Sequence, residues 1–293
     1  DYIIVSMTKL IKITSLCLFF FFSTIIIIES KPFESTYEPL PAENILIKNA
    51  SIYDGDGNEF KNTDVLVQDG KIIAIGQDLP ATKDFTVIDA TNKWVTPGII
   101  DIHSHMGVYP APGVRTSSDG NEATSPVTAD VWAEHSMWVQ DPQYALALTG
   151  GVTAFHVLPG SANLIGGRGV TVKNLQRTTI NSMKFPDAPH SLKMACGENP
   201  KRVYGNRGQA PSTRMGNAAG YRKSWIKAEG YLRKITEYEE KSDDAKELEY
   251  APRRDLEMET LAGVLRGEIL VHNHCYRADE MATMIDIAKE FNY

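Results

Sequence analysis

The sequence predicts an α/β protein in which a small β-rich module precedes a unit of alternating strands and helices. Two observations support this fold class. Between residues 45 and 96, short β-branched runs are separated by Asp-Gly and Pro-Gly turn signals. From about Val95 onward, strand-like apolar runs alternate with helical segments, a pattern typical of parallel β/α architecture.

Composition places the chain among ordinary globular proteins. It has 293 residues, of which 42% are hydrophobic and 23% charged, and the formal net charge is −7. These values exclude disordered, collagen-like and coiled-coil chains. The mild acidic excess, without a basic cluster among aromatic residues, argues against a nucleic-acid partner. Cys17, Cys196 and Cys275 are too few and too scattered to predict a disulfide framework or a thiolate zinc site, so we expect Cys196 and Cys275 to be small buried side chains.

Residues 1–30 are predicted to lie outside the fold. Met7 is followed by Lys9 and Lys12 and then by the apolar run ITSLCLFFFFSTIIII. This run matches the h-region of a secretory signal peptide better than a membrane-spanning helix. We therefore expect export, to a periplasm or out of the cell. A membrane anchor is the alternative, because no small-x-small cleavage site is evident near Ser30, and the residues before Met7 suggest upstream readthrough.

The next two segments are a short connection and a β-rich module. Residues 31–44 are expected to form a linker, and residues 45–96 a partial β-sandwich. Three strand-bearing runs follow one another closely in this module, as in a β-meander: ILIKNASIYDGDG, DVLVQDGKIIAIG and FTVIDATNKWVTPG. The module alone predicts no chemistry.

Residues 97–293 contain five further strand-like segments. They are GIIDIHSH, VTAFHVLP, GVTVKNL, SLKMAC and EILVHNH. Helices are expected over residues 128–149, around residues 225–249, and over the final segment ADEMATMIDIAKEFNY. The mixed charges of the second helical region predict a solvated helix face and not a partner-binding tail.

Two histidine pairs are the main functional signal. His103 and His105 lie in DIHSH, and His272 and His274 lie in ILVHNH. Because residues i and i+2 of a strand project to the same side, each pair can present two imidazoles to one metal ion. At the carboxyl end of a barrel strand, such side chains reach the mouth where catalytic groups lie.

The other histidines and a glycine-rich loop give weaker signals. His156 is expected to be a hydrogen-bonded core residue, whereas His135 and His190 are expected at the surface or in turns. The loop PGSANLIGGRG lacks the lysine of a phosphate loop and the spacing of a dinucleotide loop, so we expect a tight turn at an active site. Asn163 in this loop is a candidate substrate-binding residue, although a structural role is favoured.

The segment ATNKWVTPGIIDIHSHMG, preceded by NASIYDGDG and VQDGKIIAIG, resembles the amino-terminal part of the metal-dependent amidohydrolases, particularly their imidazolonepropionase-like branch. DGNEATSPVTADV, GGVTAFHVLPGSANLIGGRG and LKMACGENPKRVYG also resemble this branch, so the resemblance covers residues 45 to 293. It implies a metal-bearing (β/α)8 TIM barrel joined to a β-sandwich that both chain ends build. It also implies hydrolysis of an amide or related carbon–nitrogen bond by metal-activated water.

The resemblance implies metal ligands from three strands. His103 and His105 match the pair on the first barrel strand. At the fourth strand the family has a glutamate or a carbamylated lysine, and here Glu198 and Lys193 are the alternatives. We favour Glu198 because a carboxylate binds a metal without modification.

His272 is expected to supply the ligand of the fifth strand, and His274 is then expected to contact substrate or to orient a ligand. Either of these two histidines remains possible as the ligand. Zinc is the leading metal, as one or two ions, and manganese, iron or nickel also suit histidine with carboxylate. The expected substrate is a small amide or cyclic amide. Homo-oligomers are compatible with this reading, and contact with a membrane is expected only if residues 1–30 are retained.

The resemblance further predicts an incomplete barrel. A (β/α)8 barrel takes about 250 residues, whereas five strands are found between Gly98 and His274. The remaining units, with the aspartate that serves the family as proton shuttle, would follow Tyr293. We therefore expect a truncated, inactive fragment. The alternative is a non-catalytic homologue with a binding or structural role, or a half-barrel that assembles with a second polypeptide.

Overall fold

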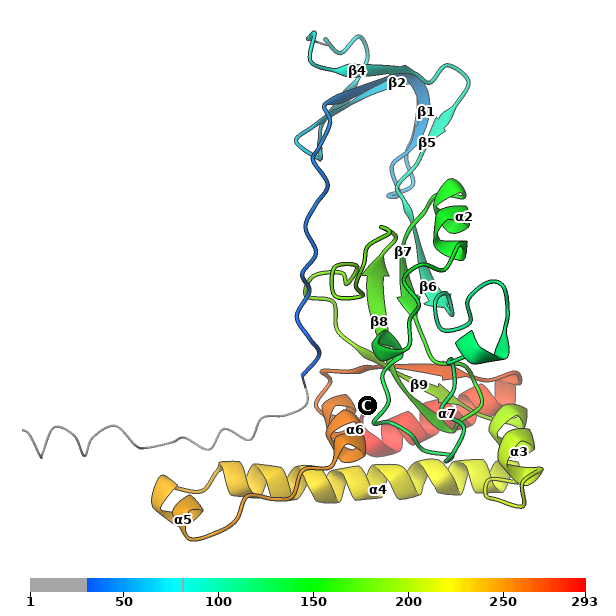
Figure 1. The fold of residues 1–293 in the computed structure, drawn as a ribbon, viewed down its shortest axis with the longest axis vertical. Helices are drawn as coiled ribbons and strands as arrows, with labels where there is room; N and C mark the ends of the chain where they lie inside the picture. The colour runs from blue at the N-terminus through cyan, green and yellow to red at the C-terminus, as the bar shows by residue number, and fades with distance from the viewer. Residues whose placement is uncertain (1–30, 81) are drawn as a thin grey trace, which may run out of the picture.

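The structure is a computed structural model that describes residues 31–80 and 82–293. The predicted signal or anchor segment, residues 1–30, lies outside the described residues. Figure 1 shows a small sheet at one end, a curled sheet in the middle and a group of helices at the other end. Among the helices of the described residues, none has the length and apolar character needed to cross a membrane.

The small sheet contains five strands: β1 (Ile45–Tyr53), β2 (Glu59–Gln68), β3 (Lys71–Gly76), β4 (Thr86–Asp89) and β5 (Trp94–Val95). The antiparallel pairs β1–β2 and β2–β3 form the predicted meander. The expectation is wrong for β4 and β5, which both return to pair in parallel with β1. Strands β1–β5 thus form one sheet, whose buried core consists of Ala50, Ile52, Val65 and Ala90.

Buried Asp64 binds both β1 and the connection that follows β3. Its carboxylate accepts hydrogen bonds from the backbone N–H of Asn49 at 2.9 Å and of Leu79 at 3.1 Å. The first bond lies at the irregularity in β1, and the second fixes the connection between β3 and β4. A buried carboxylate needs such partners, and the two bonds join β1 to the β3–β4 connection.

The second sheet holds all five predicted strands, in the order β10-β9-β8-β7-β6. They are β6 (Ile99–Ser104), β7 (Val152–Val157), β8 (Ile165–Lys173), β9 (Ser191–Ala195) and β10 (Leu270–His274). The expected parallel order is wrong at β8, which is antiparallel to both neighbours. The connection from β7 to β8 spans only residues 158–164, whereas a parallel crossover takes roughly a dozen residues or more.

The second sheet curls so that strands far apart in its order face each other. The rings of His156 in β7 and His272 in β10 stack with centroids 4.8 Å apart, although β8 and β9 lie between those strands. Such a curled sheet with helices on its outside is consistent with an incomplete TIM-barrel-like fold.

The predicted helix over residues 128–149 is wrong for most of its length. Only α2 (Gln143–Thr149) is α-helical there, and residues 133–135 form a short 3-10 turn. The preceding segment instead forms backbone hydrogen bonds with β8: Thr128 N–H donates to the Ile165 carbonyl, and Arg168 N–H donates to the Val131 carbonyl. Residues 128–132 therefore run along the sheet and do not coil.

The remaining helices are α3 (Glu198–Gly205), α4 (Arg214–Glu239), α5 (Asp243–Glu247), α6 (Leu256–Leu265) and α7 (Ala278–Phe291). The predicted charged helix and the final helix are both present, but the charged region begins earlier and divides into α4 and α5. Thr213 and Asp255 cap α4 and α6 by accepting backbone N–H groups of the first turn.

The largest core lies between α4, α6 and α7 and the β8–β10 part of the sheet (Figure 1). Its buried side chains include Ile165, Met194, Tyr221, Trp225, Leu261 and Ile287. A second core packs Tyr144 of α2 and Phe155 of β7 with centroids 5.4 Å apart. Packing on the outside of the sheet leaves its carboxyl edge free to carry polar side chains.

Candidate metal centre

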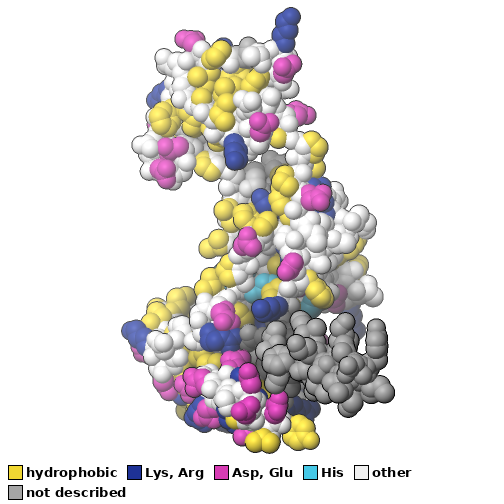
Figure 2. All heavy atoms as spheres, turned by 90° about the vertical axis from the view of Figure 1, so that its left-hand side faces the viewer, with side chains coloured by type: hydrophobic (Ala, Val, Ile, Leu, Met, Phe, Trp, Pro, Cys, Tyr) yellow, Lys and Arg dark blue, Asp and Glu magenta, His cyan; other side chains and the backbone are white. Residues whose placement is uncertain are grey.

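The candidate ligands gather where β6, β9 and β10 end. His103 lies in β6 and His105 directly follows it, while Lys193 in β9 is the register partner of His272 in β10. Strands β6, β7, β9 and β10 share one direction, so their carboxyl ends meet at one edge. Figure 2 shows histidine side chains reaching the surface near the middle of the molecule.

Lys193 is the innermost member of this group. Its side chain is 1% exposed, and its Nζ lies 3.0 Å from Nε2 of His103. Burial lowers the pKa of Lys193 to about 8, because an ammonium ion loses its hydration there. Within the part of the chain that the structure describes, no carboxylate forms an ion pair with this lysine.

The four clustered imidazoles are held in the neutral form. Burial is the largest cause that lowers the pKa of each, and the positive charge of Lys193 adds to it. For His105, a hydrogen bond to the carbonyl of Leu158 opposes the decrease without reversing it. Neutral imidazole is the form that binds a metal.

His105 also has a defined orientation. Its Nδ1 lies 2.8 Å from the Leu158 carbonyl oxygen. A carbonyl only accepts, so Nδ1 carries the proton and donates, which leaves the lone pair of Nε2 free for a ligand.

His156 is a satisfied core histidine, as predicted. It is 8% exposed, and its two ring nitrogens lie 2.9 Å from Thr171 Oγ1 and 2.5 Å from Ser191 Oγ. Burial lowers the pKa of His156 to about 4. Its ring supports His272 by stacking, a role that the sequence did not indicate.

Lys193 and Glu198, the two alternatives for the fourth-strand ligand, lie in different elements, β9 and α3. Glu198 is the first residue of α3 and is exposed, beyond the end of the strand. Its charge acts on His274, whose pKa it raises slightly against the larger effect of burial. Lys193, and not the favoured Glu198, lies against the histidine of β6.

The chemistry of the clustered side chains bears on metal binding. Across residues 31–80 and 82–293, no three His, Cys, Asp or Glu side chains are close enough together to hold one ion. The donor set still fits a divalent metal, since the imidazole of His103 contacts the buried Lys193 amine and the three other histidines lie near enough to feel its charge, and no carboxylate among the described residues pairs with it. A lysine converted to a carbamate would bring the anionic oxygens that the group lacks.

Asn163 lies inside its loop. It is 1% exposed, and its Nδ2 donates to the carbonyls of Glu122 and Ser125 at 2.7 and 2.9 Å. Its Oδ1 accepts from Asn121 Nδ2 at 3.0 Å. The amide that was a candidate for substrate binding is thus occupied by the protein.

The two remaining histidines differ. His135 is 54% exposed in its side chain, as expected. His190 lies in the connection before β9 but is buried, which corrects the expectation of a surface position, and its Nε2 lies 3.3 Å from the Glu134 carboxylate. Its position directly before the buried strand β9 accounts for this burial.

The two described cysteines correct a further expectation. Cys196 and Cys275 form a disulfide, with Cα atoms 5.1 Å apart. The pair was not evident from the sequence because its members are 79 positions apart and become neighbours only when β9 and β10 align.

Comparison with known proteins gives consistent relatives, although no family model matches the chain. The chain is 36% identical over 248 residues to amidohydrolase tasK of Hapsidospora irregularis, covering 78% of this chain and 25% of that protein. A crystal structure of an amidohydrolase from Thermotoga maritima has a TM-score of 0.76 at 41% identity, covering 85% of this chain and 62% of that one. A dihydroorotase of Ligilactobacillus salivarius is 44% identical over 70 residues, 23% of this chain and 15% of that protein.

A curled half-barrel that carries two histidine pairs at its carboxyl edge defines the class of fold and site. The chain belongs to the metal-dependent amidohydrolase superfamily, as its sequence motifs predicted. The imidazolonepropionase-like branch stays a prediction. The chain spans about a quarter of tasK and less than two thirds of the Thermotoga protein.

Proposed function

We propose that this protein is a metal-dependent hydrolase that cleaves carbon–nitrogen bonds in small amides or cyclic amides. One observation carries the proposal: two histidine pairs converge on one edge of the curled sheet with a buried lysine that has no ion-pair partner among the described residues. The names of the relatives, amidohydrolase and dihydroorotase, support the same class of bond.

The proposed ligands are His103, His105 and His272, with Lys193 as its carbamate in preference to Glu198. A bound divalent metal, with zinc as the leading candidate, supplies Lewis acidity and a water that ionises near neutral pH. Carbamylation joins the Lys193 nitrogen to the carbon of carbon dioxide and releases one proton. It needs the neutral amine, and a pKa of about 8 makes that form accessible near neutral pH.

His274 is proposed to face the substrate. It is half-buried at the end of β10, and Asn199 Nδ2 lies 3.5 Å from its Nε2, at the limit of a hydrogen bond. Its ring meets that of Tyr276 edge-on, with centroids 4.5 Å apart. An imidazole held in this way can donate to a substrate carbonyl or orient a ligand.

We also propose that the protein works outside the reducing cytosol. Disulfides persist mainly in oxidising compartments, and the Cys196–Cys275 pair supports export. The apolar run within residues 1–30 is the sequence feature that points the same way.

The test is an assay of the purified full-length natural protein that contains residues 31–293. Hydrolysis is measured with a panel of hydantoins, dihydropyrimidines, dihydroorotate and dipeptides. We expect turnover of at least one cyclic amide, its loss on treatment with a chelator, and its return with zinc. His103→Asn should abolish this turnover, while His135→Asn, at an exposed histidine outside the site, should retain it. Turnover that survives both the chelator and His103→Asn would refute the proposal.

A further inference from the structure

The disulfide joins the ends of the two strands that carry Lys193 and His274. In the parallel register of β9 and β10, His274 pairs with Ala195, so the next residues along, Cys275 and Cys196, face each other. The Cys196 N–H donates to the His274 carbonyl at 2.8 Å. The Cα separation of 5.1 Å lies within the range of a disulfide, so strand register brings the two sulfur atoms together.

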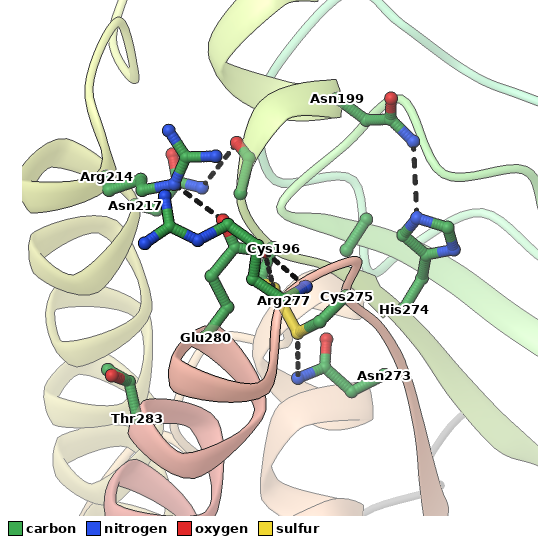
Figure 3. The surroundings of a disulfide bond; sticks show 12 residues. Cys196, Asn199, Arg214, Asn217, Asn273, His274, Cys275, Arg277, Glu280 and Thr283 are labelled. Atoms are coloured by element: carbon green, nitrogen blue, oxygen red, sulfur yellow. Dashed lines mark hydrogen bonds and ion pairs between the residues drawn. A yellow bond between two sulfur atoms is a disulfide. The ribbon is translucent and has the colours of Figure 1, made fainter.

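The turn that follows Cys196 is enclosed by two helices (Figure 3). Gly197 has a φ of +71°, and a Cβ there would lie 2.5 Å from the carboxylate of Glu280 in α7. Asn217 of α4 donates through Nδ2 to the Gly197 carbonyl at 3.0 Å. Glu280 in turn accepts from Arg214 Nε at 2.5 Å. The turn thus has one defined path between α4 and α7.

This turn leads directly to a contact with the candidate metal centre. Two residues after Gly197, the amide of Asn199 approaches His274 Nε2 (Figure 3). The same amide lies 3.3 Å from the hydroxyl of Tyr276. His274 and Tyr276 flank Cys275 in the sequence. The turn after Cys196 therefore contacts His274 through Asn199, and Cys275 is bonded directly to His274 in the sequence, so both half-cystines are linked to the position of this imidazole.

We propose that the Cys196–Cys275 disulfide is a redox-controlled clamp on the candidate metal centre. When it is closed, it fixes the ends of β9 and β10 and, with them, His274 and the turn over residues 197–199. When it is reduced, these strand ends separate and the site loses affinity for its metal. The first part of the proposal, that the disulfide fixes the strand ends and the turn, concerns the disulfide alone. The second part, that reduction lowers metal affinity, rests on the proposed function.

Opening proceeds by thiol–disulfide exchange with a dithiol reductant. Cys275 is half-buried and lines a groove of about 500 Å³ beside β10, whereas Cys196 is 3% exposed. A reductant thiolate bonds to Cys275 Sγ, and Cys196 leaves as a thiolate that takes up a proton. The second thiol of the reductant then closes a cyclic disulfide and releases Cys275 as the second thiol. Reaction with a small-molecule disulfide reverses both steps.

The experiment uses a Cys17→Ser background, in which Cys196 and Cys275 are the only cysteines. Peptide mapping without reduction should find one cross-linked pair of peptides. Hydrogen exchange of peptides containing residues 195–201 and 273–278 should then be roughly tenfold faster after reduction and alkylation, or in the variant Cys196→Ala with Cys275→Ala. Peptides from β2 and β7 are the internal controls and should exchange at unchanged rates.

Cobalt(II) titration of the same samples reads out the second part. Affinity should fall about tenfold or more when the disulfide is absent, and reoxidation of the reduced, unalkylated protein should restore it. Cysteines that are free in the oxidised protein, or exchange rates unaffected by reduction, would overturn the clamp. If cobalt binds neither form, the proposed function fails, while the exchange data still decide whether the disulfide clamps the turn.

Discussion

The side-chain nitrogen of Lys193 lies 3.0 Å from Nε2 of His103, although two other strands separate β9 from β6 in the sheet. A flat sheet would hold these strands about 14 Å apart, so the contact reflects the curl of the sheet. Burying an ammonium ion without a counter-ion is costly. The pKa of about 8 expresses that cost, and it makes the neutral amine, the form that reacts with carbon dioxide, more accessible.

The folded state should lose stability in weak acid because of His156. The pKa of His156 is about 4 in the folded state and about 6.5 in the unfolded state. Between these pH values the imidazole is protonated in the unfolded chain and neutral in the folded chain, so protons favour unfolding. The loss begins as pH falls below about 6.5 and is complete near pH 4, on the order of 3 kcal/mol. Urea unfolding of His156→Gln across this range should show a shallower pH dependence than the wild type. Equal slopes would contradict the prediction.

The buried ion pair of Glu134 and Lys184 should contribute more to the free energy of unfolding than an exposed ion pair does. Their side chains are 0% and 6% exposed and their charged atoms are 2.6 Å apart, with Lys184 Nζ also donating to the Phe33 carbonyl at 2.7 Å. Glu134→Gln leaves a buried ammonium ion, and the free energy of unfolding should fall by about 3–5 kcal/mol. Glu237→Gln, in an exposed pair with Arg233, should change it by about 0.5 kcal/mol or less.

The Glu134 carboxylate should also make the stability of the folded state depend on pH. Burial alone would raise the pKa of Glu134, but hydrogen bonds from His190 and Lys184 outweigh it and hold the pKa below 4.5. Its contribution is therefore complete above about pH 4.5 and is lost as pH falls through the folded-state pKa. The double variant Glu134→Gln with Lys184→Met should lose less stability than the sum of the single variants. Additive losses would show that the pair is not coupled.

Asn163 should behave as a structural residue. Its amide joins three segments of the loop around residues 121–128, so Asn163→Ala leaves buried carbonyl groups without donors. We expect a loss of about 1–3 kcal/mol in unfolding free energy. At temperatures where the variant is folded, KM should stay as in the wild type. A raised KM with unchanged stability would instead return Asn163 to the substrate site.

The histidine pairs could be located from sequence because strand periodicity is local. His103 and His105 are two residues apart at the end of β6, His272 and His274 are two residues apart in β10, and their shared edge follows from the common direction of these strands. The direction of β8 could also have been read from the length of its connection to β7, which is too short for a crossover.

Contacts between distant segments could not be predicted in the same way. Cys196 and Cys275 each follow a five-residue strand directly, but that equal offset has meaning only once β9 and β10 are known to be neighbours. For Lys193 a signal was present, since a lysine among the apolar residues of SLKMA is unusual in a strand whose five residues are all buried. Glu198 was favoured on its chemistry, and its place at the start of α3 is set by the turn at Gly197.

Cobalt(II) binding to Lys193→Met and Glu198→Gln tests the central claim most directly, with the wild type measured in bicarbonate buffer. If Lys193 completes the metal centre, Lys193→Met should weaken binding by roughly 100-fold or more, and Glu198→Gln by no more than about threefold. Removal of bicarbonate and carbon dioxide should weaken binding to the wild type and to Glu198→Gln, and should leave binding to Lys193→Met unchanged. Full affinity in Lys193→Met together with its loss in Glu198→Gln would contradict this assignment, and the metal centre would then be built on the α3 carboxylate.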